Sequence, residues 1–394
     1  MKIASNAYSD VGRSRENNED FLVNRPDLGL FIICDGMGGH AAGETASRKA
    51  AEVLINAIEE DLDLISIKNP AETKIYLNEK INIACKEIFR LANTVQNYSG
   101  MGTTLTMLLC QGRKAYVAHV GDSRLYLFRS GKLSLLTSDH TLLALMKQKG
   151  GVQLLDPKNS PYAHVLTRCL GKEELVLVDT LSLDLLPNDS FLLCSDGLSS
   201  AFNNDLDIET KIAELGTEAV EKLVLHAKEL DGGDNISAIT VEVISEDKQK
   251  VFADEIKLQF QILKQIYLFK DLSTQEAMQV LEVVAVQDFK AGDVIITEGE
   301  KGDFFYMILE GELEISRNGK EIATLGYGNH IGEISFLANE SRTATVRSRT
   351  NSRLMGIRST DFRDLINRDK NLGNKLLWNL AQEIGSKLSK SNGV

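Results

Sequence analysis

Four apolar runs in the first 245 residues each have an aspartate at one end. The run "LGLFIIC" leads into Asp35, a second run ends at Val120 just before Asp122, and "DSFLLCS" leads into Asp196. Asp234 directly precedes a fourth run, "NISAITVEV". Because these runs are short and rich in β-branched and large apolar residues, they predict buried strands. Each aspartate is then expected where a strand emerges at the edge of a sheet.

The four aspartates predict a cation site if the fold brings them together. A single aspartate at a strand end most often serves as a turn or cap residue. Several carboxylates at one edge repel each other unless they are protonated or cations lie between them. Oxygen ligands without a histidine or cysteine partner select Mg²⁺ or Mn²⁺.

The stretch "GRSRENNED" near the N-terminus adds three charged candidates. Arg15 presents a planar guanidinium suited to a phosphate dianion, and Glu19 and Asp20 add further oxygen ligands. The alternative is a solvated charged loop. These residues alone do not decide between the two interpretations.

Strand-like runs that follow one another directly favour antiparallel sheets rather than a doubly wound parallel sheet. Helical patterns intervene at about 43–60 and 71–95. The stretch "RKAYVAHVGDSRLYLFRSGKL" predicts a strand pair, with "RSGK" as a hairpin turn just after it. We therefore expect an α+β domain over residues 1–245.

Residues 246–262 are expected to form a helical linker to a second domain at 263–394. The apolar stripe of this linker could pair with another copy of the chain, but packing onto the next domain is favoured. Glycines between short alternating runs then predict a small β-roll, which a helical tail closes. A homodimer through the linker or the C-terminal helices stays an alternative.

Charge and cysteine content exclude several classes of protein. The net charge of −12 disfavours a surface that binds nucleic acid or an anionic membrane. No stretch has the pattern of a secretion signal or of a membrane span, so we expect a cytoplasmic protein. The five scattered cysteines fit reduced structural thiols rather than a disulfide framework.

Eight motifs follow one another in the first domain: "RENNED", "CDGMGGHAAGE", "MGTT", "HVGDSR", "LTSDHT", "LTRCLG", "CSDGL" and "GGDNISAITV". In this order they closely resemble the motifs of the metal-dependent, type 2C protein phosphatases in their bacterial form. The resemblance implies an α-β-β-α sandwich of two antiparallel sheets with two metal ions at one end. It also implies hydrolysis of phosphoserine and phosphothreonine in protein substrates.

The resemblance also implies a role for each acidic residue. Asp35 resembles the carboxylate that bridges two Mn²⁺ or Mg²⁺ ions, and Gly36 the residue whose carbonyl binds one of them. The other implied metal ligands are Asp196 and Asp234 for one ion, Glu19 and Asp20 for the second, and Asp122 with Asp196 for a third, looser ion.

The two remaining candidate roles in the first domain concern the substrate. Arg15 resembles the contact to the substrate phosphate. His40 could protonate the leaving group, since imidazole is a plausible acid near neutral pH, or it could form hydrogen bonds within its loop. Two cations can activate a bridging water, so no protein nucleophile is required.

In the second domain, "IGEISFLANESRTATV" predicts a glycine turn, a helical turn whose free N–H groups face an anion, and an arginine. Together with "GDVIITEGEKGDFFYMILEGELEIS", this stretch resembles a cyclic nucleotide-binding domain. The resemblance implies that the last helix is a lid. It implies these ligand contacts: Gly332, Glu333, Ser335, Arg342 and Thr343.

The identity of the nucleotide stays open between cyclic AMP and cyclic GMP. Trp378 on the last helix could stack on the purine, but the amphipathic pattern around it favours packing into the domain. We expect a metal-dependent serine/threonine phosphatase that a cyclic nucleotide regulates. The alternative is a catalytically silent, phosphatase-like binding module gated by the nucleotide.

Overall fold

The apolar run that leads into Asp35 forms strand β3 (Leu30–Met37), and the first five residues of this strand are fully buried. Successive side chains of a strand point to opposite faces. Ile32 belongs to a core that the sheet shares with two helices, so Phe31 and Ile33 face the other way. β3 is therefore covered on both faces, which explains why its sequence is continuously apolar instead of alternating.

The computed structural model describes residues 2–39, 41–148, 160–216, 220–244, 250–332 and 341–391. The chain divides into two units, Met1–Gln249 and Lys250–Val394. Each unit has hydrophobic clusters of its own. The linker expected at 246–262 stays a prediction, because residues 245–249 lie outside the described residues.

The first unit contains two sheets in which every strand pair is antiparallel. The six-stranded sheet has the order β2 (Asp20–Arg25), β3, β5 (Leu105–Gln111), β6 (Lys114–Val120) and β9 (Asp179–Asp184), with β4 (Gly102–Thr103) paired to β3. The five-stranded sheet has the order β1 (Lys2–Asp10), β11 (Ile236–Ile244), β10 (Ser190–Cys194), β7 (Arg124–Arg129) and β8 (Lys132–Leu135).

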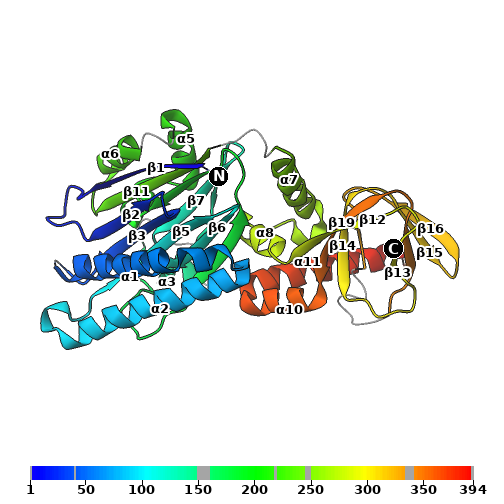
Figure 1. The fold of residues 1–394 in the computed structure, drawn as a ribbon, viewed down its shortest axis with the longest axis horizontal. Coiled ribbons are helices and arrows are strands. Elements are labelled where there is room, and N and C mark those ends of the chain that lie inside the picture. The colour runs from blue at the N-terminus through cyan, green and yellow to red at the C-terminus, as the bar shows by residue number, and fades with distance from the viewer. Residues whose placement is uncertain are drawn as a thin grey trace. The chain divides into compact units, whose positions relative to one another are not determined.

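Helices cover the outer faces of both sheets, as the α-β-β-α expectation requires. Helices α1 (Ala41–Ser66) and α2 (Pro70–Thr94) lie on one side of the sheets in Figure 1, and α5 (Asp205–Leu215) and α6 (Val220–Leu230) lie on the other. Each helix pair shares a core with the sheet beside it. The shorter helical segments are η1 (Gln96–Tyr98), α3 (Leu142–Gln148) and α4 (Asp196–Ser199).

One local prediction is wrong. β6 and β7 were expected to pair, but they belong to different sheets, and the chain passes from one sheet to the other at "GDS". Gly121 makes this crossing possible, because its φ of 115° lies in a region that other residues rarely adopt. The "RSGK" turn is confirmed, since Arg129 pairs with Lys132 across a hairpin between β7 and β8.

The second unit forms the β-roll that its glycine spacing predicts. One sheet has the order β12 (Val284–Phe289), β19 (Ser352–Arg358), β14 (Phe304–Glu310) and β17 (His330–Ile331). The other has the order β13 (Val294–Ile296), β18 (Thr345–Ser348), β15 (Leu313–Arg317) and β16 (Lys320–Leu325). Both sheets are antiparallel, and apolar side chains such as Ile308 and Leu354 lie in the core of the roll.

Helices flank this roll and supply a second cluster of apolar side chains. They are α7 (Lys250–Gln265), η5 (Tyr267–Phe269), α8 (Thr274–Leu281), α10 (Ser359–Arg368) and α11 (Lys370–Ser391). Leu258 of the expected linker packs against this cluster, and Leu263 and Ile266, which continue its apolar stripe, are buried in it, in agreement with packing onto the second domain. No helix in the described ranges is long and apolar enough to cross a membrane.

The predicted packing of Trp378 is wrong, because its side chain is 66% exposed. The neighbouring residues Leu376 and Leu380 are buried and belong to the core. The periodicity of the helix was therefore correct, but Trp378 lies on the face that turns away from the core.

Candidate active site

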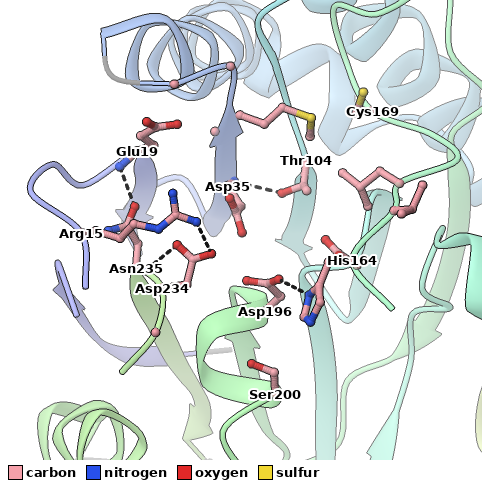
Figure 2. A pocket seen from close by; sticks show the side chains of 18 of the residues that line it. Arg15, Glu19, Asp35, Thr104, His164, Cys169, Asp196, Ser200, Asp234 and Asn235 are labelled. Atoms are coloured by element: carbon pink, nitrogen blue, oxygen red, sulfur yellow. Dashed lines mark hydrogen bonds and ion pairs between the residues drawn. The ribbon is translucent and has the colours of Figure 1, made fainter. Parts of the chain in front are cut away.

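A pocket of about 930 Å³ in the first unit collects acidic residues from both sheets. Asp35 lies on β3 and Asp122 follows β6, both in the six-stranded sheet. Asp196 follows β10 by two residues and Asp234 precedes β11 by two, both in the five-stranded sheet. Figure 2 shows Asp35, Asp196 and Asp234 around one space. The fold therefore brings the aspartates together, as the predicted cation site requires.

Asp20 and Asp35 face each other across a pair of antiparallel strands. They occupy directly opposite positions on β2 and β3, so their side chains lie on the same face of the sheet. Like charges in this arrangement destabilise a sheet. The pairing therefore points to a group that neutralises the two carboxylates.

Burial and mutual repulsion disfavour the ionised form of these carboxylates unless a cation neutralises them. Burial, with Asp196 and Asp234 nearby, raises the pKa of Asp20 to about 7. Burial, with Asp20 and Asp196 nearby, raises the pKa of Asp35 well above its usual value. Burial, followed by the charge of Asp196, raises the pKa of Asp122 to about 8.

Three buried carboxylate oxygens of this site have no hydrogen-bond partner among the described residues. They are both oxygens of Asp20 and Oδ1 of Asp196. A buried polar atom without a partner costs free energy, and most such atoms are satisfied. A divalent cation would satisfy these oxygens and lower the pKa of each carboxylate. The residues present thus fit a centre for hard divalent cations.

Two glycines let the Glu19 segment approach the start of α1. A Cβ on Gly36 would overlap the carbonyl oxygens of Gly43 and Glu19, and a Cβ on Gly43 would overlap the Glu19 carboxylate. The Ser47 hydroxyl donates to the Glu19 carbonyl at 2.7 Å. The glycine-rich sequence after Asp35 therefore brings Glu19 to the rim of the pocket.

Arg15 and Asn235 connect the N-terminal loop to the strand that follows Asp234. Nη2 of Arg15 donates to Oδ2 of Asp234 at 2.8 Å, and Asp234 in turn raises the pKa of Arg15 (Figure 2). Oδ1 of the buried Asn235 accepts a hydrogen bond from the Glu19 backbone N–H at 2.8 Å. The guanidinium side chain is about half exposed and lines the pocket.

Buried polar contacts hold the turn that carries Asp122. The Gly121 N–H donates to Nδ1 of His140 at 3.0 Å, and Nε2 of His140 lies 3.0 Å from Asp179. Arg168 donates to the same Asp179 at 2.7 Å. The turn is therefore connected to segments that belong to two further motifs, "LTSDHT" and "LTRCLG".

His164 is a member of the site that the sequence analysis missed. Its Nδ1 lies 3.2 Å from Oδ2 of Asp196, and one ligand atom each of Asp122, His164 and Asp196 lie within 4.8 Å of one another. The hydrogen bond to Asp196 raises the pKa of His164. Its side chain is 65% exposed and projects toward Asp196 (Figure 2).

Seven of the site residues predicted for the first unit line this pocket. They are Arg15, Glu19, Asp35, Gly36, Asp122, Asp196 and Asp234. Asp20 does not line it but lies directly opposite Asp35. His40 lies outside the described residues.

In the second unit, Arg342 is buried in a cradle that glycines make possible. Its guanidinium donates to the carbonyl of Gly332 at 3.0 Å and to that of Phe304 at 2.6 Å. A Cβ on Gly302 or Gly332 would overlap this guanidinium. The Thr343 side chain is exposed, and its carbonyl accepts a hydrogen bond from Arg317. Two further predicted contacts, Glu333 and Ser335, lie outside the described residues.

Comparison with known families identifies both units. Residues 12–230 match the family "Protein phosphatase 2C", and this match covers more than half of the chain. The chain belongs to the protein phosphatase 2C family. It is a protein serine/threonine phosphatase, and residues 286–369 match the family "Cyclic nucleotide-binding domain".

Similar proteins include bacterial phosphatases. The serine/threonine phosphatase stp of Listeria welshimeri serovar 6b is 34% identical over 238 residues, which are 59% of this chain and 93% of that protein. Protein phosphatase PhpP of Streptococcus pneumoniae serotype 2 is 32% identical over 247 residues, 61% of this chain and 98% of that protein. Because the matches nearly fill these relatives, the second unit of this phosphatase is an addition relative to them.

A solved structure of the same fold contains metal ions. It is the catalytic domain of the serine/threonine protein phosphatase PstP in complex with two manganese ions. It matches with a TM-score of 0.52 and 30% identity over 62% of this chain and 99% of that chain.

The sequence analysis missed two residues of the site, Asn235 and His164, and only Asn235 could have been found from a sequence motif. Asn235 stands inside the motif "GGDN", but only Asp234 was considered because a carboxylate is the expected cation ligand. His164 precedes "LTRCLG" and has no partner nearby in the sequence, since Asp196 lies 32 positions away. Only the tertiary structure could associate it with the site.

Proposed function

We propose that this phosphatase hydrolyses phosphoserine and phosphothreonine in proteins at the acidic pocket, and that a cyclic nucleotide bound to the second unit regulates its rate. The observation that carries the catalytic part is the set of buried carboxylate oxygens, on Asp20 and Asp196, that have no hydrogen-bond partner among the described residues and belong to a convergent acidic site.

The proposed metal ligands follow the positions of the carboxylates. We assign Asp35 and the Gly36 carbonyl to two cations, with Asp196 and Asp234 completing one position. The ligands of the second position are Glu19 and Asp20, directly or through water. Asp122 and Asp196 are assigned to a third, looser position. Oxygen-rich ligand sets of this kind suit Mn²⁺ or Mg²⁺.

The side chains of the pocket would bind and orient the substrate phosphate. Divalent cations at such a centre supply water activation and neutralise charge on the phosphoryl oxygens. The guanidinium of Arg15 makes one hydrogen bond within the described ranges, to Asp234, so its other donors can bind a phosphate dianion at the pocket rim. Asn235 would act as a positioning residue, because it holds the Glu19 backbone.

The regulatory part is supported by the environment of Arg342. A buried guanidinium held by two backbone carbonyls is preorganised to receive a phosphate, and Gly332 adds no side chain at the point where a Cβ would overlap that guanidinium. We propose Gly332, Glu333, Ser335, Arg342 and Thr343 as the contacts to a cyclic nucleotide. Calorimetric titration with each nucleotide distinguishes cyclic AMP from cyclic GMP.

Catalysis is tested with a phosphothreonine peptide and the full chain in the presence of Mn²⁺. We expect hydrolysis by the wild type, and a loss of at least a hundredfold in kcat/KM for Asp35→Asn. The control Asp27→Asn removes an exposed carboxylate that pairs with Arg25 outside the pocket, and it is expected to keep the wild-type rate. The silent-module alternative predicts no turnover in any of the three proteins.

Regulation is tested by measuring the same rate with and without each cyclic nucleotide, alongside calorimetric titration. We expect one nucleotide to bind with heat and to change the rate of the wild type. Arg342→Ala should abolish both effects, and Arg342→Lys, which keeps the charge but not the two-pronged geometry, should weaken them. If neither nucleotide produces heat, the second unit is not a nucleotide sensor.

A further inference from the structure

We propose that His164 supplies an imidazole nitrogen to a divalent cation that it shares with Asp122 and Asp196, so that this position favours Mn²⁺ over Mg²⁺. The proposal rests on the proposed phosphatase centre and adds a nitrogen ligand to its third cation position. The ligand set assigned to that position from the sequence contains oxygen only.

The spacing of the ligand atoms fits coordination of one ion. Two adjacent ligands of an octahedral cation with bonds of about 2.1 Å lie about 3 Å apart. Nδ1 of His164 and Oδ2 of Asp196 are separated by 3.2 Å. One carboxylate oxygen of Asp122, one ring nitrogen of His164 and one carboxylate oxygen of Asp196 all lie within 4.8 Å of one another, somewhat more than the roughly 4.2 Å between ligands on opposite sides of such an ion. Small side-chain rotations therefore bring all three around one ion.

A simple ion pair between His164 and Asp196 leaves two observations unexplained. Oδ1 of Asp196 is buried and has no hydrogen-bond partner within the described residues. Asp122, of which only 8% is exposed, adds a second carboxylate that the ion pair does not need. A cation accounts for both observations, since it takes oxygen ligands from both aspartates while the imidazole completes the set.

The backbone on both sides of His164 is held in place. The Tyr162 carbonyl accepts a hydrogen bond from the Leu143 N–H at 3.2 Å, and the Val165 carbonyl accepts one from the Leu142 N–H at 2.8 Å. These bonds connect the segment to the start of α3 and orient the His164 side chain toward Asp196 (Figure 2). Because 65% of the imidazole side chain is exposed, water can fill the remaining positions of the ion.

The ligand set decides which cation is preferred. Mg²⁺ binds through oxygen and keeps its waters, whereas imidazole nitrogen is a good ligand for transition-metal ions. Replacing His164 should therefore weaken Mn²⁺ binding more than Mg²⁺ binding. A loss of at least about tenfold in Mn²⁺ affinity is expected, since even residues that only support a ligand cost tenfold or more when changed.

The test is pulsed electron paramagnetic resonance of Mn²⁺ bound to the metal-stripped full chain, with titration to count the bound ions. The wild type should show modulation from a nitrogen-14 nucleus. His164→Asn should lose this modulation, and its weakest Mn²⁺ site should bind the ion less tightly than the same site of the wild type. The matched control is His226→Asn, which removes an imidazole that pairs with Glu229 outside the pocket. It should retain both properties.

Two results would overturn the proposal. One is a fully loaded wild type without nitrogen modulation, and the other is modulation that persists in His164→Asn. Circular dichroism of this variant checks that it folds, which we expect because the side chain is largely exposed. If the wild type binds Mn²⁺ and hydrolyses the phosphopeptide without nitrogen modulation, only this inference fails. If it neither binds Mn²⁺ nor hydrolyses the peptide, the proposed function fails as well.

Discussion

The position of a pocket residue can depend on one glycine outside the pocket lining, and Gly43 is the clearest case. Its missing side chain leaves room for the Glu19 carboxylate at the beginning of α1. Gly43→Ala should displace this carboxylate while the fold is retained. The flexible end of Glu19 can move away, and the nearest backbone atom, the carbonyl carbon of Gly36 at 3.0 Å, has to shift only slightly.

We expect kcat/KM of Gly43→Ala to fall at least tenfold at limiting Mn²⁺ and to recover partly at high Mn²⁺. The control Glu52→Ala changes an exposed residue of the same helix and should keep the wild-type rate. An unchanged Mn²⁺ dependence of Gly43→Ala would contradict the assignment of Glu19 as a ligand.

His119 gives the first unit a predictable acid sensitivity. It is 1% exposed, and burial followed by the neighbouring His140 lowers its pKa to about 3, from 6.5 in an unfolded chain. Between these values the unfolded chain binds a proton that the folded chain does not. Stability conferred by the neutral imidazole is therefore fully present above pH 6.5 and is lost as the pH falls toward 3.

One such proton changes the free energy of unfolding by about 1.4 kcal/mol per pH unit. We expect His119→Gln to lower stability near neutral pH but to show a slope smaller by about this amount between pH 4 and 6. Denaturant titration followed by far-ultraviolet circular dichroism measures both slopes. Equal slopes in the two proteins would show that His119 is not the group responsible.

At the scale of elements, a capping box starts α8 in the second unit. The side chain of Ser273 accepts a hydrogen bond from the Glu276 N–H at 3.1 Å, and Glu276 accepts one from the Ser273 N–H at 2.7 Å. Glu276 also pairs with Lys375 of α11 at 2.8 Å. The start of one helix is thereby connected to another helix of the same core.

Ser273→Ala should destabilise the second unit by about 1 kcal/mol, the usual cost of losing such a cap. The control Ser359→Ala changes the first residue of α10, where no side-chain cap bond is present. Denaturation followed by the fluorescence of Trp378 reports on this unit, because Trp378 is the chain's one tryptophan. Equal losses in the two variants would mean that the cap contributes nothing.

At the scale of the whole molecule, the separate cores predict separate unfolding transitions. A ligand that binds only the folded state stabilises the unit that contains its site, by about 2.7 kcal/mol at a hundred times its Kd. Mn²⁺ should therefore shift the circular dichroism transition of the first unit and leave the Trp378 transition in place. A common shift of both signals would show that the two units unfold together.

Much of the fold could be predicted because its signals are local. The apolar runs, the glycine-ended turns and the helical spacing each lie within a few residues, and they correctly indicated antiparallel strands, intervening helices and a β-roll. The arrangement as a sandwich of two sheets between helices came from the resemblance to the type 2C phosphatases. The carboxylates at strand ends predicted a cation site on the condition that the fold brings them together, and the structure gathers Asp35, Asp122, Asp196 and Asp234 at one pocket.

By itself the sequence determined which residues carry charge at the ends of buried strands, because strand periodicity and side-chain chemistry are properties of short segments. Only the tertiary structure decided that β6 and β7 lie in opposite sheets, that Trp378 faces outward, and that His164 meets Asp122 and Asp196. These outcomes depend on which segments pack together across long stretches of chain, and no local pattern encodes that choice.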